Sequence, residues 1–183
     1  MKSAMIVNNR NIRDVAKYIG LSLTTKGLSV SPLKLQKILY YTQAWFMAML
    51  GRENTLFNDI PEAWVNGPVY PVIYYDYRDK AANMCDHLES TVFYNGDPLE
   101  GLEVYTRVLD LDTESLELIE SIVTLYGAQT QNKLIWLTHS EQPWAEARAG
   151  LRPGERSERK LSLDLMCDYY HARYEHNHRQ HEN

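Results

Sequence analysis

The stretch from Ser31 to Gly51 constrains the fold of this 183-residue chain more than any other. Ser31 is a candidate N-cap, and Pro32 stands at the first helical position, where its missing N–H costs nothing. Gly51 supplies a C-terminal stop. A helix of about twenty residues would span about 30 Å, enough to cross a small domain. We therefore predict a long central helix with one apolar stripe, made of Leu35, Ile38, Leu39, Thr42, Trp45, Phe46 and Met49.

Weaker helical patterns lie on both sides of this segment. Capping residues and apolar spacing predict further helices at Asn11–Ile19 (stopped by Gly20), from Pro71 to before Asn83, from Asp112 to Gly127, from Thr130 to near His139, and from Ser162 to Tyr174. The sequence Asn66-Gly67-Pro68 predicts a turn, and Pro143-Trp144 predicts a short one. Thr91–Tyr94 followed by Asn95-Gly96 predicts a β-hairpin, although Asp97-Pro98 weakens its return strand.

These patterns predict a mainly α fold: a compact, single-domain helical bundle around a long central helix, with a small β-hairpin or short strand element. We expect one domain over residues 1–174. Residues 175–183 contain three histidines and no apolar side chain, so this tail is expected to fray.

Composition indicates the class of protein, its compartment and the partners that it excludes. Hydrophobic residues make up 44% and charged residues 23%, as in ordinary globular proteins. The two cysteines, Cys85 and Cys167, form no metal-binding or disulfide pattern, and the sequence has no signal-peptide core or membrane span, so we expect a cytoplasmic protein. A net charge of −5 argues against direct binding of duplex DNA.

Two features of the sequence suggest a binding surface. Thirteen Tyr and four Trp stand against three Phe, so most aromatic side chains carry a polar tip. The segment from Asp97 to Glu120 carries eight acidic residues against Arg107 alone, which would steer a basic partner or form a solvated helix face. We expect much of the tyrosine surplus to be framework, leaving outward-facing members near the acidic segment as candidate contacts.

Standard catalytic motifs are missing from the sequence. His139-Ser140-Glu141 matches half of a zinc-deaminase signature, but Trp144 stands where the first cysteine ligand is required. The histidines of the C-terminal tail lack the four fixed ligands of a structural zinc site. We predict no catalytic residue, no metal and no cofactor; the alternative is a small metal-dependent hydrolase that uses His139 and Glu141.

Three blocks of sequence together resemble the Panacea antitoxin domain, also called the SocA-like or GepA-like domain. The first block is Ser31–Trp45, which resembles the opening helix of that family. The second contains Leu56-Phe57 and then Glu62–Tyr74, with the segment A-W-x-x-G-P-V. The third, Leu137–Trp144, carries T-H-x-x-x-P-W. The resemblance covers residues 10–172, and the order and spacing of the blocks make it specific.

The resemblance implies a bacterial or phage-borne antitoxin that binds a toxin encoded next to it. One branch of the family acts as an adaptor that delivers its toxin to a ClpXP-type protease, which is an alternative mechanism here. The family is not known for enzymatic activity. Some members carry an added DNA-binding domain, for which we expect no residues in this chain.

Each block has a structural and a binding interpretation. In the first, Lys34, Gln36, Lys37, Tyr40 and Tyr41 cannot all share the buried stripe, so some are expected either to face a partner or to cover the edge of the core. In the second and third, Thr138 and His139 would hydrogen-bond the turn, with Trp144 closing over it, or would contact the toxin. The candidate partner-binding residues are Lys34, Gln36, Lys37, Tyr40, Tyr41, Trp45, Trp64, Gly67, Pro68, Thr138, His139, Pro143 and Trp144.

Overall fold

Helix α2 (Pro32–Leu50) begins and ends where the capping signals predict. The Ser31 hydroxyl accepts a hydrogen bond from the Lys34 amide, and Gly51 ends the helix with a φ of 109°. In the computed structural model, which describes residues 10–181, every side chain of α2 up to Ala44 is buried. This part of α2 therefore has no solvent-facing side, and the predicted central helix is confirmed.

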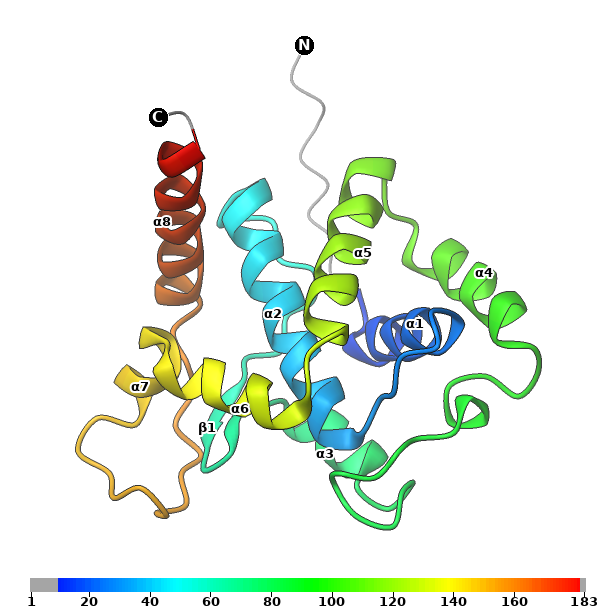
Figure 1. Ribbon diagram of the computed structural model, residues 1–183, viewed down its shortest axis with the longest axis horizontal. Helices are drawn as coiled ribbons and strands as arrows, with labels where there is room; N and C mark the ends of the chain where they lie inside the picture. The colour runs from blue at the N-terminus through cyan, green and yellow to red at the C-terminus, as the bar shows by residue number, and fades with distance from the viewer. Residues whose placement is uncertain (1–9, 182–183) are drawn as a thin grey trace.

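Other helices pack around α2 on several sides (Figure 1). Helices α1 (Ile12–Thr25) and α5 (Thr113–Gly127) lie on one side, and α8 (Leu163–His181) lies on the other. The remaining helical elements are α3 (Pro71–Tyr77), the 3₁₀ turn η1 (Ser90–Val92), α4 (Pro98–Leu109), α6 (Gln131–Ser140) and α7 (Gln142–Ala147). The mainly α architecture is as predicted.

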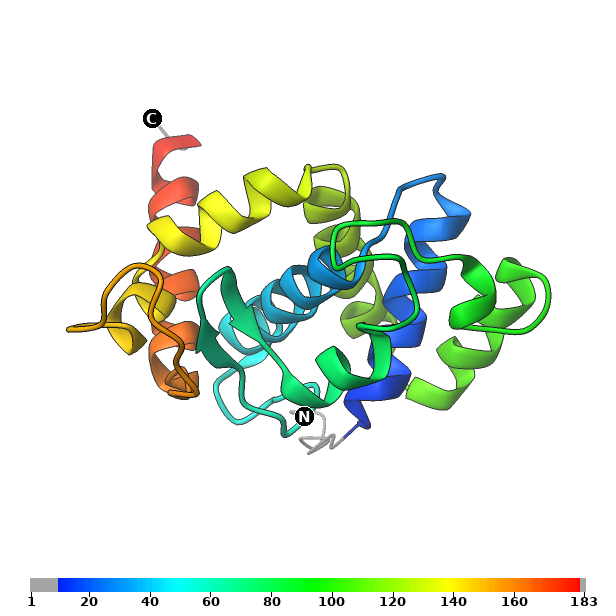
Figure 2. The same ribbon diagram turned by 90° about the horizontal axis from the view of Figure 1, so that it is seen from below.

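The small β element is a pair of three-residue strands at the Asn66-Gly67 turn. Strands β1 (Glu62–Trp64) and β2 (Gly67–Val69) are antiparallel, with Glu62 opposite Val69 and Trp64 opposite Gly67. Strand β2 contacts both α2 and α6, and Figure 2 shows the strand pair alongside α2. The predicted turn is confirmed, and it connects the two strands of the sheet.

The hairpin predicted at Thr91–Gly96 is wrong. Residues 90–92 form η1 instead, and the backbone of Gly96 does not adopt the positive φ that a tight hairpin turn requires. The Asp97 carboxylate accepts a hydrogen bond of 2.8 Å from the Leu99 amide, and Pro98 takes the first helical position. The sequence Asp97-Pro98 therefore starts α4, a helix that the sequence analysis missed.

The predicted stop of the first helix at Gly20 is also wrong, because α1 continues to Thr25 and Gly27 ends it with a φ of 68°. Leu21 and Leu23 extend its buried face. Gly20 instead gives room to the ring of Phe93: a Cβ at Gly20 would lie 2.5 Å from two ring atoms.

The C-terminal tail also differs from expectation. Helix α8 runs past Tyr174 to His181, so residues 175–181 extend the last helix. The predicted N-cap of this helix is present, since the Ser162 hydroxyl accepts a hydrogen bond from the Leu165 amide.

Gly20→Ala is expected to lower the free energy of unfolding by about 1–3 kcal/mol, because overpacking against Phe93 outweighs the better helix propensity of alanine. Urea unfolding measures this change. Gly154→Ala is the matched control: its Cβ meets open space, so a change within about 0.5 kcal/mol is expected. A Gly20→Ala protein as stable as the wild type would contradict this packing.

Candidate functional site

The three sequence blocks meet at the backbone of Gly67. Gly67 has a φ of 103°, and a Cβ there would lie 2.7 Å from the Thr138 hydroxyl and 2.8 Å from Lys37 Nζ. These neighbours come from α6 and α2, which are far apart in the sequence. Only glycine satisfies both the backbone angle and the close approach.

Side chains of α2 hold the second block in place. Lys37 is fully buried, and its Nζ donates a hydrogen bond of 3.0 Å to the Pro68 carbonyl. Burial lowers the pKa of Lys37 to about 7. The Gln36 side-chain amide donates to the Tyr70 carbonyl at 3.2 Å and accepts from the Tyr70 amide at 2.8 Å, as a neighbouring strand would.

Trp144 of the third block contacts the turn, whereas the Thr138 hydroxyl donates to the Ile135 carbonyl of its own helix and not to the turn. Trp144 Nε1 donates a hydrogen bond of 2.9 Å to the Trp64 carbonyl. The His139 ring stacks on Trp144 with centroids 3.9 Å apart, and Pro143 is buried at the start of α7. Burial, together with the charges of Lys37 and Arg148, lowers the pKa of His139. His139 Nε2 has no hydrogen-bond partner within residues 10–181.

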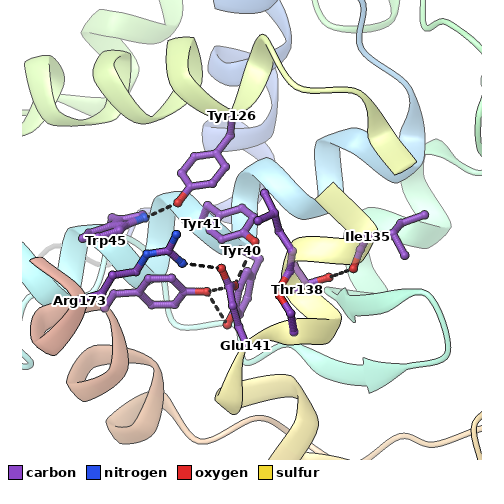
Figure 3. A network of polar contacts seen from close by, with 11 residues as sticks. Tyr40, Tyr41, Trp45, Tyr126, Ile135, Thr138, Glu141 and Arg173 are labelled. Carbon is purple, nitrogen blue, oxygen red and sulfur yellow. Dashed lines mark hydrogen bonds and ion pairs between the residues drawn. The ribbon is translucent and has the colours of Figure 1, made fainter. Parts of the chain in front are cut away.

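Glu141 is the centre of a buried polar network that the sequence analysis did not find (Figure 3). Its carboxylate accepts hydrogen bonds from the Tyr41 hydroxyl at 3.0 Å, from the Tyr170 hydroxyl and from Arg173 Nη1 at 3.0 Å. Burial raises the pKa of Glu141, although these three donors act in the opposite direction. Tyr170 and Arg173 lie on the predicted last helix, but nothing in their spacing indicated a buried acid opposite them.

Aromatic packing extends this network along α2. The Tyr41 ring stacks on Tyr126 with centroids 3.8 Å apart, and Trp45 Nε1 donates to the Tyr126 hydroxyl at 2.8 Å. Tyr40 packs edge-on against Tyr170. The tyrosines of the first block are therefore part of the core.

The expectation that some of Lys34, Gln36, Lys37, Tyr40 and Tyr41 face a partner is wrong, because all five are buried. Lys34 Nζ donates to the Gly127 carbonyl at 2.6 Å. Helical spacing identifies one apolar stripe, but α2 is enclosed by neighbours on several sides, so its polar side chains are also covered.

The exposed part of the second block continues into α3. The Trp64 ring packs against Tyr74 with centroids 4.8 Å apart, and Tyr74 packs against Tyr75 at 5.3 Å. The Arg78 guanidinium lies 5.1 Å from the centroid of Tyr75, whose side chain is 61% exposed. We call Trp64, Tyr74, Tyr75 and Arg78 the aromatic surface. The sequence analysis named Trp64 as a site residue, but not the other three.

Comparison with known proteins identifies the family. The sequence model described as "Antitoxin SocA-like, Panacea domain" matches residues 35–145. The chain belongs to the SocA-like Panacea antitoxin family. It is 32% identical over 158 residues to Antitoxin SocA from Caulobacter vibrioides (strain NA1000 / CB15N), an alignment that covers 85% of this chain and 77% of the relative. No solved structure matches the chain.

The site of this Panacea domain does not unite the residues of the hydrolase alternative. The His139 ring stacks on Trp144, whereas the Glu141 carboxylate is bound by Tyr41, Tyr170 and Arg173. Within residues 10–181, no three His, Cys, Asp or Glu side chains come close enough to hold a metal ion. None of the helices in this part of the chain has both the length and the apolar composition needed to cross a bilayer.

Gly67→Ala is expected to destabilise the domain by more than about 2 kcal/mol, because a Cβ there would displace Thr138 and Lys37 in addition to straining the backbone. Gly150→Ala is the matched control, since Gly150 has a φ of 81° with open space around it and reports backbone strain alone. If urea unfolding shows the same loss of unfolding free energy in Gly67→Ala and Gly150→Ala, the close approach of Thr138 and Lys37 to Gly67 does not contribute to stability.

Lys37 predicts a pH dependence of stability. Its folded pKa of about 7 lies below the ordinary lysine value, so between pH 7 and 9 the unfolded chain binds more protons than the folded chain. Stability should therefore rise by about 2 kcal/mol over this range in the wild type relative to Lys37→Met. Urea unfolding at several pH values tests this. Lys133→Met, which removes an exposed lysine, should keep the wild-type dependence.

Proposed function

We propose that this chain is an antitoxin that neutralises a toxin encoded beside it by binding that toxin directly. Membership of the Panacea antitoxin family supports a toxin partner. The aromatic surface is the observation that carries direct binding. Trp, Tyr and Arg are the residue types that most often dominate binding energy at protein interfaces, and here they contact one another on the outside of the fold.

Trp64, one residue of the aromatic surface, is held in position before any partner arrives. Trp64 Nε1 donates to the Glu62 carboxylate at 2.8 Å, and its carbonyl accepts from Trp144. Rigid anchors lose little conformational freedom on binding, so more of their contact energy appears as affinity. Holding a toxin silent at nanomolar concentration requires about 12 kcal/mol, which an interface of about 1,600 Å² with a few such anchors supplies.

The family residues then divide into two roles. Lys37, Gly67 and Thr138 act through position, because their contacts fix the turn that carries Trp64. Trp64, His139 and Trp144 are only partly buried, so part of each side chain is open to contact with a toxin. In this proposal the toxin contacts Trp64, His139 and Trp144 directly. Lys37, Gly67 and Thr138 affect binding only by holding the turn in place.

Tyr75→Ala is expected to weaken toxin binding by about 10- to 100-fold, the loss typical of an exposed aromatic anchor, with unchanged stability. Isothermal titration with toxin that has been separated from the complex measures the affinity. Growth on co-expression measures neutralisation. Leu99→Ala on α4 is the control, since Leu99 is as exposed as Tyr75 but outside the aromatic surface. Full affinity and full rescue with Tyr75→Ala would remove this surface from the interface.

The adaptor alternative is separated from direct binding by the host strain. Direct neutralisation predicts that the wild-type chain rescues growth equally well in a host lacking ClpXP. Rescue that disappears in that host would favour delivery of the toxin to the protease.

A further inference from the structure

Glu62 and Trp64 lie together on the outer face of β1. Side chains two residues apart in a strand share a face, and here Ala63 between them is buried while Glu62 and Trp64 are partly exposed. Trp64 Nε1 donates to Glu62 Oε2 at 2.8 Å, which holds the carboxylate against the edge of the indole ring. The strand therefore presents an acid and an aromatic ring side by side.

The Glu62 carboxylate forms no ion pair within residues 10–181. Lys160 lies opposite Glu62 across a β-bridge, but the two side chains do not pair. The carboxylates on and just after α3 are both paired, Asp76 with Arg13 at 2.7 Å and Asp79 with Arg78 at 3.2 Å. Among these three carboxylates, Glu62 is the one whose charge a partner can balance.

Trp64 is the ring of the aromatic surface over which, within residues 10–181, no lysine or arginine lies. The Arg78 guanidinium, in contrast, lies 5.1 Å from the ring centroid of Tyr75 and 5.9 Å from that of Tyr74. Tryptophan is the aromatic side chain that attracts cations most strongly, and the attraction grows when water is removed from the contact. The neighbouring tyrosines show that rings of this surface accept a guanidinium.

We propose that Trp64 and Glu62 together bind an arginine side chain of the toxin. This inference rests on the proposed function, since it assigns the chemistry of the partner at the same surface. A guanidinium is planar, so it stacks on the indole ring while its forked N–H groups bind the carboxylate beside that ring. A lysine ammonium has neither the plane nor the fork, so arginine is the side chain that fits both groups.

Glu62→Gln in the full chain tests this proposal. The side-chain carbonyl of glutamine keeps an acceptor for Trp64 Nε1, so the variant removes the charge and retains the support of the ring. Isothermal titration with the isolated toxin should show about fivefold weaker binding at about 50 mM NaCl, because one interfacial ion pair is lost. At about 500 mM NaCl the difference should fall below about twofold, because salt screens the pair. A loss that does not depend on salt would indicate a structural role of Glu62 and overturn the proposal.

Glu103→Gln on α4 is the matched control, because it removes the same charge from an exposed position outside the aromatic surface. Its affinity for the toxin should stay within about twofold of the wild type, since the two proteins differ only in net charge. Equal losses in Glu62→Gln and Glu103→Gln would show a general charge effect and overturn the proposal. Wild-type affinity in Glu62→Gln with a loss in Tyr75→Ala would overturn this inference alone and leave the proposed function standing.

Substitutions in the toxin identify the bound side chain. Each arginine and lysine of the toxin is replaced by alanine, and each variant is titrated against the wild-type chain and against Glu62→Gln. One arginine substitution should weaken binding to the wild-type chain by about fivefold and have little further effect on binding to Glu62→Gln, because both changes remove the same contact. Coupling to a lysine, or to no residue, would contradict the assignment of arginine.

Discussion

The hydrogen bond from the buried Lys37 ammonium to the Pro68 carbonyl is the contact on which the arrangement of this domain depends. A helix that is enclosed on several sides must satisfy each of its polar side chains internally. In α2 they bind backbone groups of segments that have few regular partners: Lys37 binds β2, Gln36 binds Tyr70, and Gln43 binds the Leu56 amide and the Phe57 carbonyl. The polar residues of the first block therefore replace the hydrogen bonds that a larger sheet would provide.

The sequence predicted the parts of the fold that local signals decide. Ser31-Pro32, Asp112 and Thr130 each start a helix as expected, because capping is settled within one turn. Asn95-Gly96 failed because Asp97-Pro98 offers a competing helix start, and Gly20 failed because its role depends on Phe93, 73 positions away. Enclosure of α2 could not be predicted either, since periodicity along one helix contains no information about how many neighbours surround it.

The candidate site shows the same division. In the structural interpretation of the third block, Trp144 closes over the turn and Thr138 bonds to it; Trp144 does donate to the Trp64 carbonyl, but the Thr138 hydroxyl donates to Ile135. The sequence pattern mixes residues that position the turn with residues that reach the surface, and only their burial separates them. The tyrosine surplus divides similarly: Tyr40, Tyr41, Tyr70, Tyr126 and Tyr170 are buried, whereas Tyr75 is open to solvent. Glu141 remained hidden because its partners come from α2 and α8, more than twenty-five residues away on either side.

The third block contacts two parts of the domain, the turn and α8, which both also pack against α2. Trp144 binds the backbone of Trp64 beside the turn, whereas Glu141, three residues earlier, binds α8 through Tyr170 and Arg173. The junction between α6 and α7 is therefore fixed from both sides. A substitution at Glu141 would loosen α8 and shift the support of Trp64 together, so a loss of toxin binding there would not identify a contact residue. Side chains at the outer edge, such as Tyr75, separate the two effects because no buried partner depends on them.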